Sequence, residues 1–156
     1  MFDDLRDLYQ EVILDHGKNP RNFRRPENAT CLAHGNNPVC GDTLVIYITL
    51  DDDGLITDAA FQGQGCAISV ASASMMTDIV NGKTVDAAKR LFDGFHHMCT
   101  KDDFDMAELG DCDEDALERL VMLSGVKEFP IRVKCATLAW HTMQAAVSGD
   151  HDISTE

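Results

Sequence analysis

The stretch TLVIYITLDDDGLITDAAFQGQGC, residues 43–66, decides the fold. Its first part alternates strictly, and the apolar side chains on one face are Leu44, Ile46, Ile48 and Leu50. Because successive side chains of a strand point to opposite faces, this alternation is typical of a β-strand over residues 43–50. The acidic turn at residues 51–54 is followed by a second strand-like run from Leu55 to about Phe61. The sequence therefore predicts an antiparallel hairpin.

The residues outside the hairpin predict mainly helices. Residues 66–80 are rich in Ala, Ser and Met and predict a buried helix, and residues 84–92 predict a second one that begins at a threonine cap. Pro130 opens a final helix. Residues 5–16 carry apolar side chains at helical spacing, and His16 on that face is expected to be packed and hydrogen-bonded.

The order of these elements indicates the fold class. A further strand is expected over residues 30–35, so the chain runs helix, strands, helices. This order predicts an α+β fold, in which several helices pack on one face of a small antiparallel sheet of about three strands. We expect a single domain over residues 1–150, with an acidic insertion or long loop at about 93–112. The tail, residues 151–156, is expected to be flexible.

Composition and charge narrow the classes of function. The formal net charge of −14 opposes binding to nucleic acid, because such a protein repels phosphates. No apolar run approaches the roughly 20 residues that span a bilayer, so no membrane association is expected. The first residues lack the apolar core of a secretory signal, so we expect a cytoplasmic protein. In that reducing compartment its six cysteines are expected to be thiols or metal ligands rather than disulfides.

Three cysteines lie at the edges of predicted elements and are candidate metal ligands. Cys40 precedes a strand, whereas Cys66 and Cys135 lie near helix N-termini, which favour a thiolate. Asp42 is close enough to Cys40 for both side chains to reach one ion. Three thiolates and a carboxylate suit zinc, and they also suit iron bound with sulfide. The carboxylate is the hard ligand of this soft set, so we expect it to be the easier one to displace.

The spacing of these cysteines leaves a second interpretation open, because it contains no CxxC pair and buried, inert cysteines are common. The other thiols match no motif and are expected to be spectators: Cys31, Cys99 and Cys112. A second metal site built from His96, His97, Cys99 and Cys112 is conceivable, but a solvated loop is the expected state. The chain has one basic cluster, which consists of Arg21, Arg24 and Arg25. We expect these arginines either to contact a partner or only to keep a loop solvated.

Four separate motifs in this chain resemble the NifU/IscU-like family of iron–sulfur cluster assembly proteins. They are YQEVILDHGKNPRN at residues 9–22, NNPVCGD at 36–42, FQGQGCAISVASAS at 61–74 and KCATL at 134–138. Within the family the chain is most similar to the SufU type. Lys134 stands where the scaffold type has a histidine, and residues 129–134 depart from the Leu-Pro-Pro-Val-Lys motif of that type. Extra residues between the second and third cysteines also agree with the SufU type.

The resemblance implies a role for each motif residue. Asp42, Cys66 and Cys135 would hold Zn²⁺, and Cys40 would bind it at rest. Cys40 would then be released to accept persulfide sulfur from a cysteine desulfurase of the SufS type, whose histidine takes the vacated position. The chain would be a sulfurtransferase-like carrier rather than a stand-alone enzyme, and would pass sulfur to downstream iron–sulfur assembly proteins.

Two other functions remain open from the sequence. The same residues, with Fe²⁺ or an iron–sulfur cluster in place of zinc, would make a scaffold on which a [2Fe–2S] cluster is assembled and passed to apo-proteins. A purely structural zinc module is the third possibility. In that case, replacing Cys40 should have the same effect as replacing Cys66.

Overall fold

The computed structural model describes residues 11, 13–27, 29–38, 41–100, 120, 123, 130–149 and 152–154. Within these ranges the strands are β1 (Cys31–Asn37), β2 (Asp42–Leu50), β3 (Ile56–Gln64) and β4 (Asp152–Ser154). Between β3 and β4 in the chain lie the helices α2 (Ala67–Val80), α3 (Val85–Thr100) and α5 (Pro130–Val147). Residues 13–18 are also helical. The helix predicted over residues 5–16 therefore continues to residue 18.

The four strands form one sheet in the order β3-β2-β1-β4. The predicted hairpin is confirmed by β2 and β3, which pair antiparallel with Tyr47 opposite Ala60. The expected third strand is confirmed as β1, which pairs antiparallel with β2 and extends two residues further than predicted. The sequence pattern did not indicate β4, which pairs parallel with β1, because three residues are too short to show alternation.

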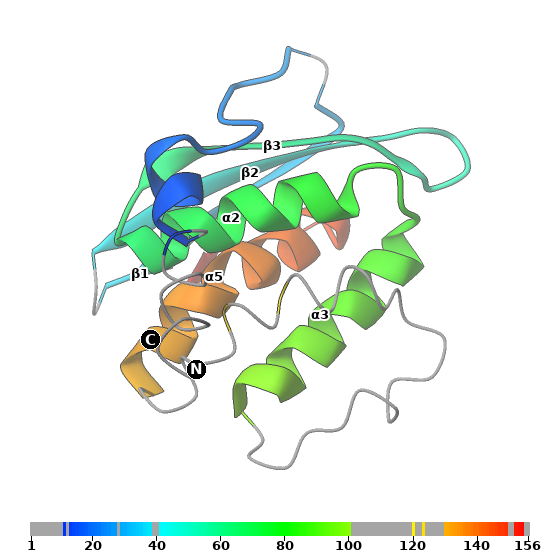
Figure 1. The fold of residues 1–156 in the computed structure, drawn as a ribbon. Helices are drawn as coiled ribbons and strands as arrows, with labels where there is room; N and C mark the ends of the chain where they lie inside the picture. The colour runs from blue at the N-terminus through cyan, green and yellow to red at the C-terminus, as the bar shows by residue number, and fades with distance from the viewer. Residues whose placement is uncertain are drawn as a thin grey trace.

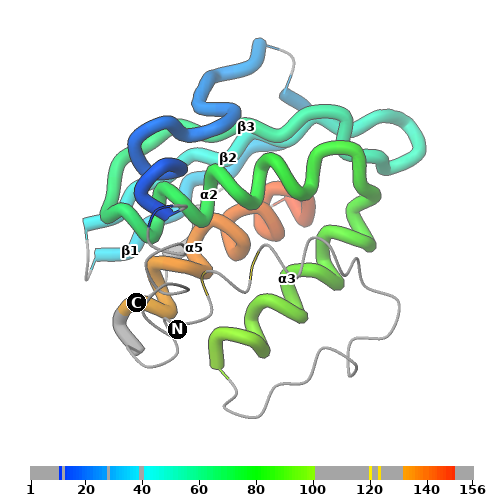
Figure 2. The backbone as a smooth tube through the Cα atoms, viewed as in Figure 1, coloured from blue at the N-terminus to red at the C-terminus, as the bar shows by residue number. Residues whose placement is uncertain are grey.

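The helices lie on one face of this sheet (Figure 1), which confirms the predicted α+β class. Helix α5 packs against β1 and β2, and α2 packs against β3 and α5. Helix α3 contacts α5 and lies further from the sheet, as the backbone trace shows (Figure 2). No helix in the described ranges is both long and apolar enough to cross a bilayer.

The core lies between the sheet and the helices. Leu44, Ile46 and Ile48 point into it and are fully buried, as the alternation predicts. Close packing of α5 on β1 depends on Gly35, because a Cβ at this position would lie 2.0 Å from Oγ1 of Thr142.

Helix α3 corrects one prediction. Residues 93–100, expected to belong to the insertion or loop, are helical. The helix continues because Phe92, Phe95 and Cys99 recur at helical spacing and are buried, at 4%, 0% and 0% exposure. Intervening polar residues concealed this stripe in the sequence. The rest of the expected insertion, with Cys112, lies outside the described residues.

One serine of α2 contacts two residues of the N-terminal segment. Nδ1 of His16 lies 2.7 Å from Oγ of Ser74, and the backbone N–H of Arg21 donates to the same oxygen at 2.8 Å. A hydroxyl can accept from Arg21 and still form a second hydrogen bond with His16, whose direction depends on the tautomer of the imidazole. His16 is 8% exposed, so the expectation of a packed, hydrogen-bonded histidine is confirmed.

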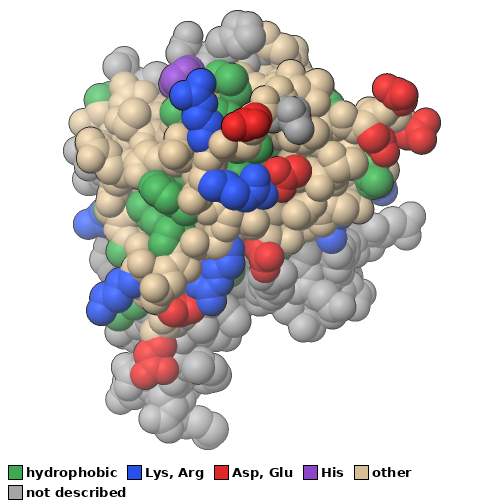
Figure 3. Space-filling view, turned by 90° about the horizontal axis from the view of Figure 1, so that it is seen from above, with side chains coloured by type: hydrophobic (Ala, Val, Ile, Leu, Met, Phe, Trp, Pro, Cys, Tyr) green, Lys and Arg blue, Asp and Glu red, His purple; other side chains and the backbone are tan. Residues whose placement is uncertain are grey.

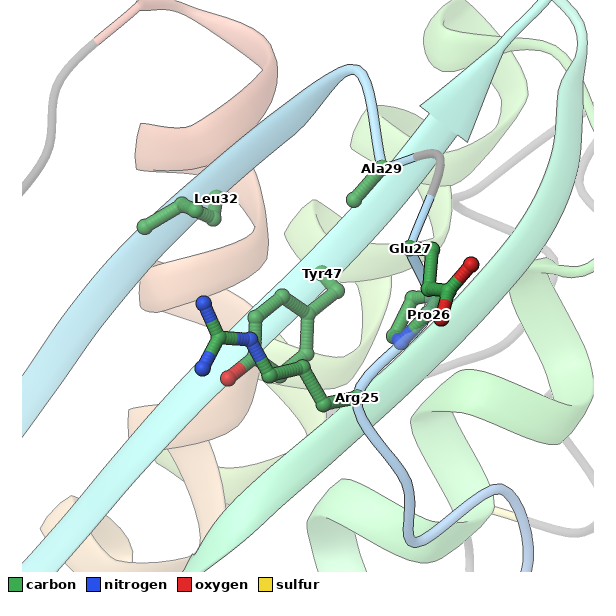
Figure 4. Close-up of a pocket in the computed structure, with 6 residues that line it drawn as sticks. All are labelled: Arg25, Pro26, Glu27, Ala29, Leu32 and Tyr47. Atoms are coloured by element: carbon green, nitrogen blue, oxygen red, sulfur yellow. The ribbon is translucent and has the colours of Figure 1, made fainter.

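The sheet face opposite the helices carries charged side chains of both signs (Figure 3). Arg21 forms an ion pair with Asp15, and Arg24 pairs with Asp58. Arg25 instead lines a hollow between the preceding loop and strands β1 and β2 (Figure 4). The residues around this hollow are Arg25, Pro26, Glu27, Ala29, Leu32 and Tyr47. Two of the three clustered arginines thus have partners within the chain.

Candidate metal centre

Three of the four predicted ligands come together at one end of the molecule. Asp42 begins β2, Cys66 precedes α2, and Cys135 lies in the second turn of α5; these element ends meet at the left of Figure 1. One ligand atom from each residue, the two sulfurs and a carboxylate oxygen, lies within 4.8 Å of the other two. The fourth predicted ligand, Cys40, lies outside the described residues.

Asp42 is held by hydrogen bonds to both of its carboxylate oxygens. Oδ1 accepts from the backbone N–H of Cys66 at 2.8 Å, and Oδ2 accepts from Nδ2 of Asn37 at 3.2 Å. The side chain is fully buried. Gly65 permits this close approach, because a Cβ there would lie 2.5 Å from Oδ1. Burial and two donors oppose the expectation that this carboxylate is the ligand most easily displaced.

Cys66 is the N-cap residue of α2. Its backbone is extended, with φ −70° and ψ 164°, and its sulfur accepts from the backbone N–H of Ser69 at 3.4 Å. This places the sulfur at the positive end of the helix dipole, where negative charge is stabilised. The side chain is only partly buried. Cys66 is therefore the more accessible of the two thiols in the described part of the site.

Cys135 is fully buried on α5. Its Sγ lies 3.6 Å from Nδ2 of Asn37, the same atom that donates to Asp42. Neither Cys66 nor Cys135 forms a disulfide, so both sulfurs are available as metal ligands. The donor set consists of the buried thiol of Cys135, the partly buried thiol of Cys66 and the buried carboxylate of Asp42. It fits zinc or iron, because both ions accept sulfur and oxygen ligands together.

The remaining described thiols lie outside this cluster. Cys31 starts β1, at the opposite end of that strand from Asn37, and burial raises the pKa of its thiol. Cys99 is buried in the core under α3. In the described ranges His96 and Cys99 belong to no group of three metal-ligating side chains, and Asp42, Cys66 and Cys135 form the one such group. Cys112, which the second site would also need, lies outside the described residues.

Sequence reasoning assigned no role to Asn37, although it lies within the quoted NNPVCGD motif. Asn37 lies on the same, core-facing side of β1 as Ala33 and Gly35, and all three residues are buried. An asparagine at a core-facing strand position must find hydrogen-bond partners, and this signal could have identified it.

Two thiols and a carboxylate, which come together where β2 and two helices begin, form a possible metal-binding site. The chain belongs to the family described as the NifU-like N-terminal domain, whose model matches residues 8–136. This confirms the family that the motifs indicated.

Individual relatives agree with this assignment. The zinc-dependent sulfurtransferase SufU of Bacillus subtilis is 41% identical over 142 residues, which cover 90% of both chains. The iron–sulfur cluster assembly scaffold protein IscU of Streptococcus pyogenes is 39% identical, covering 92% of this chain and 84% of its own. A crystal structure of a SUF-system scaffold protein from Fervidobacterium islandicum matches with a TM-score of 0.75. It is 33% identical, over 88% of this chain and 94% of its own.

Proposed function

We propose that this protein is a zinc-bound sulfur acceptor, which takes persulfide sulfur from a cysteine desulfurase of the SufS type for iron–sulfur cluster assembly. The observation that carries the proposal is the convergence of Asp42, Cys66 and Cys135, with all three ligand atoms within 4.8 Å of one another. The 41% identical SufU of Bacillus subtilis supports zinc as the metal. Lys134, where the scaffold type has histidine, supports sulfur transfer over cluster assembly.

Each residue of the site has a distinct task in this proposal. Zinc would be held by four side chains: Asp42, Cys66, Cys135 and Cys40. The charge of the bound cation would keep the three cysteine sulfurs deprotonated. The hydrogen bonds on both oxygens of Asp42 keep this ligand in place. Cys40 is the reacting residue.

The reaction of Cys40 is a thiolate–persulfide exchange. The Cys40 thiolate attacks the terminal sulfur of the desulfurase persulfide, a new S–S bond forms on Cys40, and the desulfurase cysteine leaves as a thiolate. One sulfur atom moves between two cysteines, so no external oxidant or reductant is consumed. Passing this sulfur to a downstream iron–sulfur assembly protein repeats the same exchange with Cys40 as the leaving group.

Charge and thiol chemistry suggest the partners and the compartment. The net charge of −14 favours a desulfurase that presents a basic surface, because complementary charge speeds encounter. The reaction needs free thiols, which a reducing compartment such as the cytoplasm maintains.

A scaffold for a [2Fe–2S] cluster is the second candidate. The observation that favours it is the 39% identity to a protein named as an IscU scaffold. Thiolates also ligate such clusters. The two functions differ in what the isolated protein holds and in whether one cysteine turns over.

Metal analysis and a desulfurase assay on protein purified without oxygen test the proposal. We expect about one zinc per chain, and mass spectrometry should find the added sulfur on Cys40 after incubation with desulfurase and cysteine. Cys40→Ser should abolish stimulation of the desulfurase while zinc is retained. Cys31→Ser, a free thiol at the far end of β1, is the matched control and should behave as wild type.

Two outcomes would contradict the proposal. A brown chromophore that transfers to an apo-protein would establish the scaffold instead. Equal loss of folding in Cys40→Ser and Cys66→Ser, without a specific loss of sulfur transfer, would indicate a structural zinc module.

A further inference from the structure

Asn37 connects two of the candidate ligands through a single nitrogen atom. It is the last residue of β1 and pairs with Asp42 across the sheet. Its Nδ2 lies 3.2 Å from Oδ2 of Asp42 and 3.6 Å from Sγ of Cys135. The side chain is fully buried. The two hydrogens of one amide group therefore serve a carboxylate and a thiol that come from different layers of the fold.

The other end of the same amide has no partner. Oδ1 of Asn37 is buried and forms no hydrogen bond among the described residues. An unsatisfied buried acceptor costs about 1–3 kcal/mol. Turning the amide over would not help, because Oδ1 would then face two other acceptors, the carboxylate of Asp42 and the sulfur of Cys135. The fold tolerates this cost at a position where the amide hydrogens face two candidate ligand atoms.

The donors are unevenly distributed among the candidate ligands. Asp42 receives two hydrogen bonds and is fully buried, and Cys135 is fully buried beside Asn37. Cys66 receives the N–H of Ser69 at 3.4 Å and is partly exposed. Among the three described ligands, the two that Asn37 contacts are thus the more deeply buried ones.

We propose that Asn37 is a positioning residue that fixes Asp42 and Cys135 as a permanent ligand pair, so that ligand exchange is confined to Cys40 and Cys66. The proposal rests on the proposed function, because it concerns the zinc ligands. It also replaces the expectation from ligand hardness. The hard carboxylate stays because the protein holds both of its oxygens, and exchange takes place at sulfur.

The substitution Asn37→Leu tests this role. Leucine is branched at Cγ like asparagine and is larger, and it lacks both the amide donor and the unpaired acceptor. We expect the zinc affinity, measured by competition with a chromophoric chelator, to fall about 10–100-fold, the usual effect of removing a group that orients a ligand. The rate of zinc release into excess chelator should rise. Asn36→Leu is the matched control, since Asn36 is the exposed neighbour on the same strand and should leave both quantities unchanged.

Two further measurements separate positioning from a structural role. In the cobalt(II)-substituted protein, the thiolate-to-metal absorption bands should change in Asn37→Leu and not in Asn36→Leu. Asn37→Leu should lower the thermal unfolding midpoint of the metal-free protein, because Asp42 loses a buried hydrogen bond, and should lower the midpoint of the zinc-loaded protein by more. The increase in the midpoint on adding zinc therefore becomes smaller. An equal loss of stability with and without zinc would overturn the proposal.

The result for wild type distinguishes this inference from the proposed function. If wild type binds zinc and Asn37→Leu binds it equally well, the inference about Asn37 is wrong and the proposed function stands. If wild type itself does not bind zinc, both fail.

Discussion

Replacing Gly65 with alanine would push a methyl group against the most deeply held ligand of the site. The added Cβ would lie 2.5 Å from Oδ1 of Asp42 and 3.1 Å from its Cβ and Cγ. To reach 3.0 Å, below which real Cβ contacts are essentially never found, the two atoms must separate by about 0.5 Å. Asp42 is fully buried, so its side chain has little room to move away.

The movement acts directly on a hydrogen bond. Oδ1 of Asp42 also accepts from the N–H of Cys66 at 2.8 Å. A displacement of that size lengthens the bond beyond the ordinary range of about 2.7–3.2 Å. Losing a buried hydrogen bond to a charged group costs about 1.5–3 kcal/mol. Alanine also lowers the conformational entropy of the unfolded chain, which stabilises the folded protein by about 0.4–1 kcal/mol. The net expectation for Gly65→Ala is a loss of about 1–2 kcal/mol in the free energy of unfolding.

Urea unfolding of the metal-free protein measures this loss, and chelator competition measures the accompanying fall in zinc affinity, about 10-fold or more. Gly17→Ala is the matched control, because a Cβ there meets only ordinary contacts at 3.7–3.8 Å. It should be neutral or slightly stabilising. If Gly65→Ala proves as stable as wild type and binds zinc as tightly, Asp42 is not held as described and the reasoning fails.

Two further predictions concern the packing around α5. Gly35→Ala should cost about 1–3 kcal/mol in urea unfolding, because the new Cβ would lie 2.0 Å from Oγ1 of Thr142. The double substitution with Thr142→Ala should cost less than the sum of the two single ones, and strict additivity would contradict the assigned clash. Burial, and to a smaller extent the charge of His96, lowers the pKa of His141 in the folded protein. The unfolded state therefore binds the proton more readily, and stability falls as the pH drops from above the ordinary histidine pKa of about 6.5 to below the folded value. His141→Gln should therefore reduce the fall in the free energy of unfolding between about pH 7.5 and about pH 5.5, measured by urea unfolding. An unchanged pH dependence of that free energy would refute the prediction.

Local sequence patterns were sufficient for most of the elements. Strict alternation at residues 43–50 identified β2, since one face had to be buried, and Leu44 and Ile46 are fully buried. Pro130 marked the start of α5 correctly. The end of α3 was missed because acidic and polar residues such as Asp93 alternate with the buried stripe. Periodicity is averaged over a window, so a stripe with polar interruptions gives a weak signal.

The site itself was predictable only through the family resemblance. No local pattern brings β2, the start of α2 and the start of α5 to one point; that depends on the sheet register and on α5 packing over β1 and β2. The pairing of Asn37 with Asp42 is part of the same register. The role of Asn37 therefore became visible only when a strand-end amide and a helical sulfur were found within hydrogen-bonding reach of each other.

The position of Asp42 gives a physical reason to expect a different order of lability from the one that ligand chemistry alone suggests. Hardness compares ligands as free ions in water, where each is equally able to leave. In this fold Asp42 would leave two donors, the N–H of Cys66 and Nδ2 of Asn37, without their acceptor in a buried space. Each buried donor left unpaired costs about 1–3 kcal/mol. Cys66, partly exposed and with a single backbone donor at 3.4 Å, leaves less behind. In the proposed function, anchoring the one oxygen ligand would let the protein free a sulfur while it keeps its metal.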